Sequence, residues 1–157
     1  MATLQRKYKL GLAAAMMAGV LGIGGCAQMN SMMGGGDKMM AGGGTQRVTL
    51  SGANEVPSIN TSASGTGEVT VKADGSVSAS IKVTGMAATA GHIHQGAAGA
   101  NGPVIVPFTK DGDTFTAAPN AKFSEAQLAA FKAGNTYVNV HTAANPGGEI
   151  RAQLKGN

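Results

Sequence analysis

Short segments of alternating polar and apolar residues, separated by glycine-containing turns, most constrain what this chain can fold into. Residues 65–71 and 76–83 are two such segments, and they flank Ala73, Asp74 and Gly75, a sequence typical of a hairpin turn. In the second segment aliphatic residues alternate with Ser and Lys, so one face is apolar and the other polar. This pattern predicts antiparallel strands with one buried face.

The same pattern recurs through the rest of the chain. Further strands are predicted at residues 47–51, 85–96, 104–109, 114–117, 135–142 and 149–155. One short helix is predicted after Ser124, because Gln127 completes a capping box and Gly134 can end the helix. We therefore expect an all-β fold, an antiparallel, Greek-key-like β-sandwich of about seven to eight strands with one short helix.

Residues 1–25 have the features of an export signal. A basic start precedes an apolar run at residues 10–22, which is too short for a comfortable membrane span. Small residues then precede Cys26, the only cysteine, in an arrangement that resembles a bacterial lipobox. The resemblance implies that Cys26 is lipidated and tethers the protein to a membrane, and Ala27 after it favours the outer membrane. The alternative is an ordinary secretory signal followed by an unused cysteine.

The basic balance of the chain comes mostly from this signal. The chain has 12 Lys+Arg and 8 Asp+Glu, and three of the basic residues lie in residues 1–25, so the remainder carries 9 − 8 = +1. We see no basic stripe interleaved with aromatic residues, so a nucleic-acid partner is not expected.

Residues 26–45 form a Gly- and Met-rich segment that we interpret as a flexible tether between the lipid and a domain at residues 46–157. Thioethers are soft ligands that suit Cu(I). The tether therefore offers five candidate Cu(I) ligands: Met29, Met32, Met33, Met39 and Met40. The alternative is a low-complexity spacer whose methionines bind nothing.

All three histidines lie in two of the predicted strands. His92 and His94 are two residues apart, so they project from the same face of a strand. If the strand with His141 belongs to the same domain, three imidazoles can converge on Cu(II) or, less favoured, Zn(II). Gln95 and Asn139 are candidates to support the ligands through hydrogen bonds. The alternative is a structural role, with the histidines bonded to loop carbonyls.

Five motifs occur in order along the proposed domain: LSGANEVP at residues 50–57, AGHIHQG at 90–96, NGP at 101–103, GNTYVNVHT at 134–142 and NPGGEIR at 145–151. Together they resemble the CHRD domain, the repeat first described in chordin and found singly in many bacterial exported proteins. The resemblance covers residues 46 to about 154. It implies a β-sandwich, and it implies little about activity.

The spacing of the histidines is also similar to that of the copper ligands of Cu/Zn superoxide dismutase. This similarity implies that His92, His94 and His141 are copper ligands. The bridging histidine and the zinc ligands of that enzyme are absent from the sequence, and no motif marks Arg151 as its catalytic arginine. A dismutase-like oxidoreductase is therefore the alternative function and not the first.

Two further features leave their roles open. Glu149 and Arg151 are interpreted as a solvated pair on an edge strand, or as a partner-binding pair, and Glu55 as a loop carboxylate that fixes a turn before Pro57.

No Gly-x-Ser-x-Gly elbow is present, and we expect that the protein is not an enzyme.

These features favour a lipid-anchored binding module outside the cytoplasm that holds a transition metal, with copper favoured. It would face the periplasm or the cell exterior. A metal-free structural or adhesive domain is the further alternative. The sequence names no protein partner.

Overall fold

The computed structural model describes residues 44–156, so the predicted export signal, Cys26 and the five methionines of the predicted tether lie outside the described residues. The elements are β1 (Gly44–Ser51), η1 (Gly52–Asn54), β2 (Ser64–Val71), β3 (Val77–Thr84), β4 (Ala88–Gln95), β5 (Val104–Asp111), β6 (Thr114–Ala117), α1 (Glu125–Lys132), β7 (Thr136–Thr142) and β8 (Ile150–Gln153). The all-β class with one short helix is confirmed. Within the described residues, no helix is long and apolar enough to cross a membrane.

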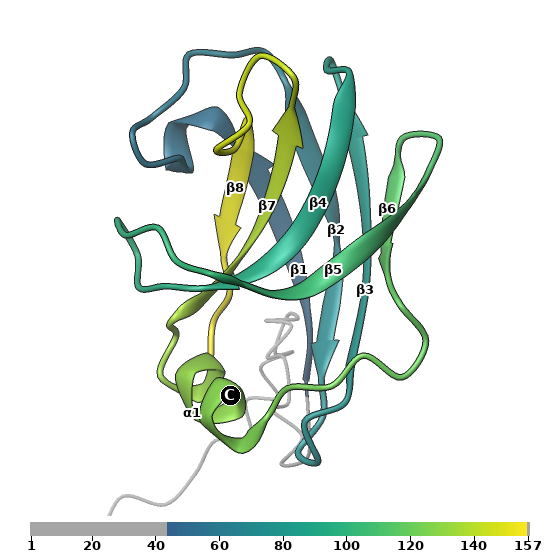
Figure 1. Cartoon of the computed structure of the whole chain (residues 1–157), viewed down its shortest axis with the longest axis vertical. Helices are drawn as coiled ribbons and strands as arrows, with labels where there is room; N and C mark the ends of the chain where they lie inside the picture. Colours follow the sequence, from purple (N-terminus) through teal and green to yellow (C-terminus); the bar gives the residue numbers. More distant parts are fainter. Residues whose placement is uncertain (1–43, 157) are drawn as a thin grey trace, which may run out of the picture. The chain divides into compact units, whose positions relative to one another are not determined.

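The eight strands close into an antiparallel barrel in the order β1-β2-β3-β6-β5-β4-β7-β8 (Figure 1). The expectation of a two-sheet sandwich is therefore wrong. The Greek-key connectivity is present, because the β3–β4 and β6–β7 connections each bypass two strands. A barrel and a sandwich require the same alternation along each strand, so alternation alone could not separate them.

The barrel closes between its first and last strands through few backbone contacts. β1 and β8 share one registered pair, Ser51 with Arg151. Farther along, the side chain of Gln46 accepts a hydrogen bond from Lys155 N and donates one to Lys155 O. The side-chain amide of Gln46 thus takes the place of a backbone partner. Such a contact leaves no trace in a hydrophobic pattern.

The aliphatic residues fill the barrel interior as the alternation predicts. In the β2–β3 hairpin Val69, Val71, Ile81 and Val83 are buried, while their neighbours are exposed or half-buried. The turn uses Gly75 at φ +85°, a conformation that favours glycine. Asp74 accepts hydrogen bonds from the backbone and the hydroxyl of Ser76. Across the barrel Ile93, Val138, Val140 and Ile150 are fully buried.

Helix α1 has the capping box that the sequence predicts. The side chain of Ser124 accepts from Gln127 N, and the side chain of Gln127 accepts from Ser124 N. The buried Phe131 packs near Phe123, with ring centroids 6.0 Å apart. Figure 1 shows α1 beside the end of the barrel at which β8 finishes.

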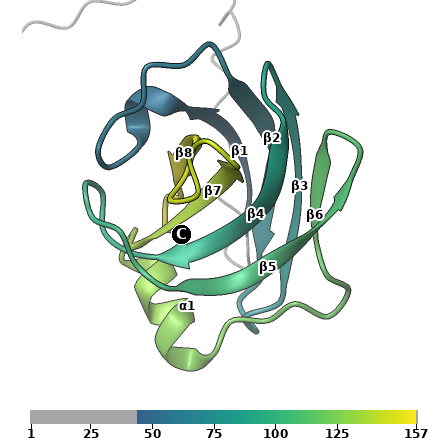
Figure 2. The same cartoon turned by 45° about the horizontal axis from the view of Figure 1, so that its top comes forward.

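The outer face of β7 is covered as well as its inner one, and the outer faces of β4 and β8 beside it are partly covered. All seven residues of β7 are buried, so its outward side chains are also hidden from water. Loops at residues 52–63 and 96–103 lie on the same side of the barrel as β8 (Figures 1 and 2). A polar layer therefore lies outside the barrel and beneath loops, and it contains the histidines.

Candidate metal centre

The structure brings the three histidines together on the outer face of the barrel. His92 and His94 lie on β4, and His141 lies on the adjacent strand β7. β4 and β7 are antiparallel neighbours, with His92 opposite Asn139 and His94 opposite Tyr137. The residues between the histidines enter the core, so the alternation that builds the barrel also turns all three imidazoles outward.

One ligand nitrogen from each ring lies within 4.8 Å of the others. The shortest approach is between His92 Nδ1 and His141 Nε2, at 3.0 Å. A metal about 2.0 to 2.1 Å from each nitrogen requires nitrogen pairs no farther apart than about 4.2 Å. Nitrogens as far apart as 4.8 Å must therefore close by at least about 0.6 Å, and by about 1.4 Å for a tetrahedral metal, which side-chain rotations can supply.

Two loop carbonyls determine which nitrogens are free. His94 Nδ1 is 2.9 Å from Gly102 O, and His141 Nδ1 is 3.0 Å from Pro146 O. A carbonyl oxygen can only accept, so both Nδ1 atoms carry the hydrogen and both Nε2 atoms expose a lone pair. The available ligand atoms are therefore His94 Nε2 and His141 Nε2, and the nitrogen of His92 that lies beside them is Nδ1, 3.0 Å from His141 Nε2. Without a metal, His92 Nδ1–H can donate to His141 Nε2.

His94 Nε2 is buried and has no hydrogen-bond partner. An unsatisfied buried polar atom costs about 1 to 3 kcal/mol, so such atoms are rare and call for an explanation. A positive ion at the centre of the cluster would satisfy this lone pair. The residues present therefore fit a metal.

All three imidazoles have pKa values below the ordinary range. Burial, followed by the neighbouring His141 and His94, lowers the pKa of His92 to about 4. Burial is also the main cause of the lowered pKa of His94 and of His141. The rings are therefore neutral at pH 7, which is the form that binds metals.

The donor set restricts the metal. Three neutral imidazoles suit Cu or Zn, whereas Ca²⁺ and Mg²⁺ prefer oxygen ligands. Three protein ligands leave a coordination position for water or another ligand.

The comparison with known families supports one assignment. A model of the CHRD domain matches residues 46–154. The chain belongs to the CHRD family. Searches of curated proteins and of solved structures gave no match. The family assignment inferred from the five motifs is thereby confirmed.

Of the two residues expected to support the ligands, Asn139 contacts a carboxylate in this CHRD domain. Asn139 is buried, and its Nδ2 donates to Glu55 Oε1 at 2.9 Å and to Oε2 at 3.2 Å. Burial, as the main cause, raises the pKa of Glu55 to about 7. Gln95 is half-buried and lies at the end of β4.

Arg151 corrects the interpretation of a solvated edge pair, because it is only 1 % exposed. Its guanidinium lies 3.4 Å from the centre of the Tyr137 ring and donates to Asn101 Oδ1, Ala97 O and Gln153 Oε1. The one ion pair within residues 44–156 joins other residues. Glu149 is also buried, and it accepts from Thr142 and Asn145 and not from Arg151.

Sequence reasoning missed Tyr137, whose ring stacks on that of His94 with centroids 4.9 Å apart and planes at 9°. The available signal was its position, two residues before Asn139 on the face that carries His141. Glycine-rich loops next to three strands with polar outward residues were a second signal that this face would be covered.

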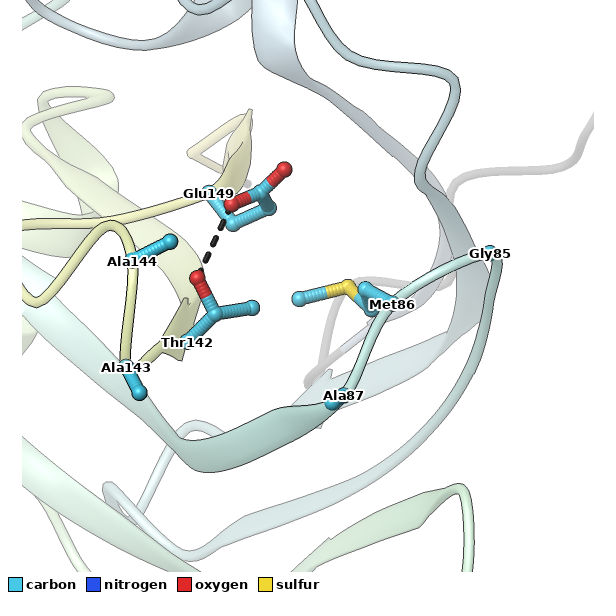
Figure 3. A pocket seen from close by; sticks show the side chains of 7 residues that line it. All are labelled: Gly85, Met86, Ala87, Thr142, Ala143, Ala144 and Glu149. Carbon is cyan, nitrogen blue, oxygen red and sulfur yellow. Dashed lines mark hydrogen bonds between the residues drawn. The ribbon is translucent and has the colours of Figure 1, made fainter.

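An open hollow of about 350 Å³ lies at one end of the barrel, lined by residues 85–87, 142–144 and Glu149 (Figure 3). The thioether of Met86 extends toward Thr142, whose hydroxyl donates to Glu149. Hydrogen bonds from neighbouring side chains, with that of Thr61 first, lower the pKa of Glu149. Among the described residues, the only carboxylate that lines the hollow is that of Glu149, which already accepts hydrogen bonds from neighbouring side chains, and none of the histidines lines the hollow.

Proposed function

We propose that this CHRD domain is a metal-binding module held outside the cytoplasm by a lipid on Cys26. His92, His94 and His141 are the ligands, and copper is the favoured metal. The protein is not an enzyme in this proposal. It stores, delivers or sequesters the metal at the outer membrane.

The observation that carries the proposal is the convergence of three imidazole nitrogens within 4.8 Å of one another, one of which, His94 Nε2, is buried without a hydrogen-bond partner. Two of the three rings are fixed by loop carbonyls in the tautomer that leaves Nε2 free. Hydrogen bonds from the non-ligating nitrogen to backbone carbonyls are typical of metal-bound histidines. Neutral rings at pH 7 remove the competition from protons.

The preference for copper rests on the all-imidazole donor set and on the sequence before residue 44. Imidazole binds Cu(II) more tightly than Zn(II) in the general order of divalent metals. The five tether methionines add soft thioethers that suit Cu(I). The proposal therefore assigns Cu(II) to the three histidines and Cu(I) to the methionines of the tether.

A metal-free interaction domain is the second candidate, and the same carbonyl contacts favour it. Hydrogen bonds from His94 to Gly102 O and from His141 to Pro146 O are the bonds that structural histidines would make. This candidate does not account for the buried, unpartnered His94 Nε2. A dismutase-like activity has no comparable support. Arg151, the residue compared with the catalytic arginine of Cu/Zn superoxide dismutase, is buried against Tyr137. The strand order places Tyr137 between Arg151 and His94, so the tyrosine ring separates the guanidinium from this candidate ligand.

Calorimetric titration of the untagged full chain with Cu(II) and with Zn(II) tests the proposal. We expect sub-micromolar Cu(II) binding to wild type, weaker Zn(II) binding, and loss of the histidine-dependent binding in His92→Ala and His141→Ala. Lys82→Ala changes an exposed side chain on β3 and is the control. Wild-type binding no tighter than that of an unstructured peptide, or unchanged in both histidine variants, would leave the metal-free candidate.

A further inference from the structure

Tyr137 contacts the candidate ligand His94 in two ways. Its ring stacks on the imidazole, with centroids 4.9 Å apart and an interplanar angle of 9°. Its hydroxyl accepts a hydrogen bond from Gly102 N at 3.1 Å. The carbonyl of the same glycine accepts from His94 Nδ1 at 2.9 Å. Tyr137 therefore holds both the ring and the backbone group that sets the ring's tautomer.

The loop that carries Gly102 has little freedom to move. A Cβ on Gly102 would lie 1.7 Å from Gln95 O, and one on Gly96 would lie 3.0 Å from Tyr137 Cε1. The loop therefore packs directly against the end of β4 and against the tyrosine ring. Glycine at both positions permits this close approach.

Arg151 holds the same loop from the other side of the ring. β4 and β8 flank β7, so the ring of Tyr137 lies between the imidazole of His94 and the guanidinium of Arg151. The guanidinium donates to Ala97 O and Asn101 Oδ1 in the loop. A cation over an aromatic face is stabilising, and more so when both are buried.

We propose that Tyr137 is a positioning residue that keeps His94 in the tautomer with Nε2 free, acting through Gly102 and through the ring stack. Tyr137 is not itself a ligand. Its effect on metal affinity rests on the proposed function, whereas its effect on the tautomer of His94 does not. Loss of a partner that orients a metal ligand typically weakens metal binding about 10- to 100-fold.

Tyr137→Phe in the full chain removes only the hydroxyl and keeps the ring. The chain has three histidines, so histidine-selective ¹⁵N labelling gives an imidazole spectrum with three residues to assign. In metal-free wild type we expect His94 with Nδ1 protonated and Nε2 bare. In Tyr137→Phe we expect His94 to become a mixture of tautomers and the Kd for Cu(II) to rise about tenfold.

The matched control is Thr45→Val, which removes a hydroxyl that bonds to Thr70 at the far end of β1. It should leave the His94 tautomer unchanged and the Kd within about twofold of wild type. Urea unfolding of each variant shows whether a change in affinity only reflects lost stability.

A wild-type His94 protonated at Nε2 would overturn the proposal, and so would an unchanged tautomer in Tyr137→Phe. If Tyr137→Phe does not fold, the wild-type spectrum still tests the premise of the proposal, which requires His94 to be protonated at Nδ1 with Nε2 bare. A wild type that binds no Cu(II) would refute the proposed function and leave the tautomer result to decide the role of Tyr137.

Discussion

Replacing Glu55 by Gln tests the polar layer outside the barrel through the pH dependence of stability. Glu55 is 7 % exposed, and burial raises its pKa from 4.5 to about 7. Between these two pH values the folded chain holds the proton while the unfolded chain releases it. Raising the pH across this window therefore lowers the free energy of unfolding.

The size of the effect follows from the shift. A rise from 4.5 to about 7 is about 2.5 pKa units, and at 1.36 kcal/mol per unit this is about 3 kcal/mol. Gln cannot ionise, and its amide can accept from Asn139 Nδ2 and donate to Asn139 Oδ1, which is buried without a partner. The stability of Glu55→Gln relative to wild type should therefore rise by about 3 kcal/mol between pH 4 and pH 8.

Urea unfolding followed by circular dichroism at several pH values measures this difference. Titrations that both proteins share cancel in the comparison. Glu68→Gln is the control, because Glu68 forms an exposed pair with Arg47, and its difference from wild type should stay within about 0.5 kcal/mol. A stability difference for Glu55→Gln that is independent of pH, or that falls as pH rises, would refute the inference that Glu55 is held neutral by burial.

Three more predictions concern the same layer. Metal binding at pH 7 should release almost no protons, because burial lowers the pKa of all three histidines, and titration in two buffers of different ionisation heat measures this. Gly148→Ala should destabilise the fold by about 1 to 3 kcal/mol in urea unfolding, because φ at Gly148 is +141° and a Cβ there would lie 2.4 Å from Asn139 Nδ2. Gly147→Ala is the control and should not destabilise the fold, because a Cβ at that position meets no atom within 4 Å. Arg151→Met should cost about 2 kcal/mol or more in unfolding, because buried acceptors lose their donors, whereas Arg47→Met at an exposed site should cost less than about 0.5 kcal/mol. Equal effects within either of the last two pairs would contradict the burial argument.

The elements that the sequence predicted correctly are those that local residues determine. The β2–β3 hairpin depends on a turn and on alternation within two adjacent segments. The helix depends on Ser124 and Gln127, three residues apart. Predicting that the histidines meet required one long-range assumption, that β4 and β7 belong to one domain. The alternation along each strand then placed the three side chains on the same face of the sheet.

The features that sequence reasoning missed depend on contacts between distant segments. Barrel closure joins the two ends of the domain through the pairing of Ser51 with Arg151 and through the hydrogen bonds of Gln46 with Lys155, 109 residues away. Arg151 was predicted to be solvated because the outward face of its strand is polar. It is buried because loops cover that face, and the alternation of polar and apolar residues along a strand does not predict where loops lie. The same covering loops supply the carbonyls of Gly102 and Pro146, which bond to His94 and His141. Loop carbonyls were an expected alternative partner of the histidines, but the residues that supply them were not predicted. Backbone acceptors carry no side-chain signature, so no pattern in the sequence marks them.

Electron paramagnetic resonance of the full chain with one equivalent of Cu(II) tests the central claim most directly. Samples with ¹⁴N- and with ¹⁵N-labelled histidine should both show coupling of the copper to three nitrogens, with a splitting that changes with the isotope. This is the result that His92, His94 and His141 as joint ligands predict. Coupling to fewer than three histidine nitrogens, or a spectrum that the label does not change, would place the metal elsewhere and contradict the three-histidine site.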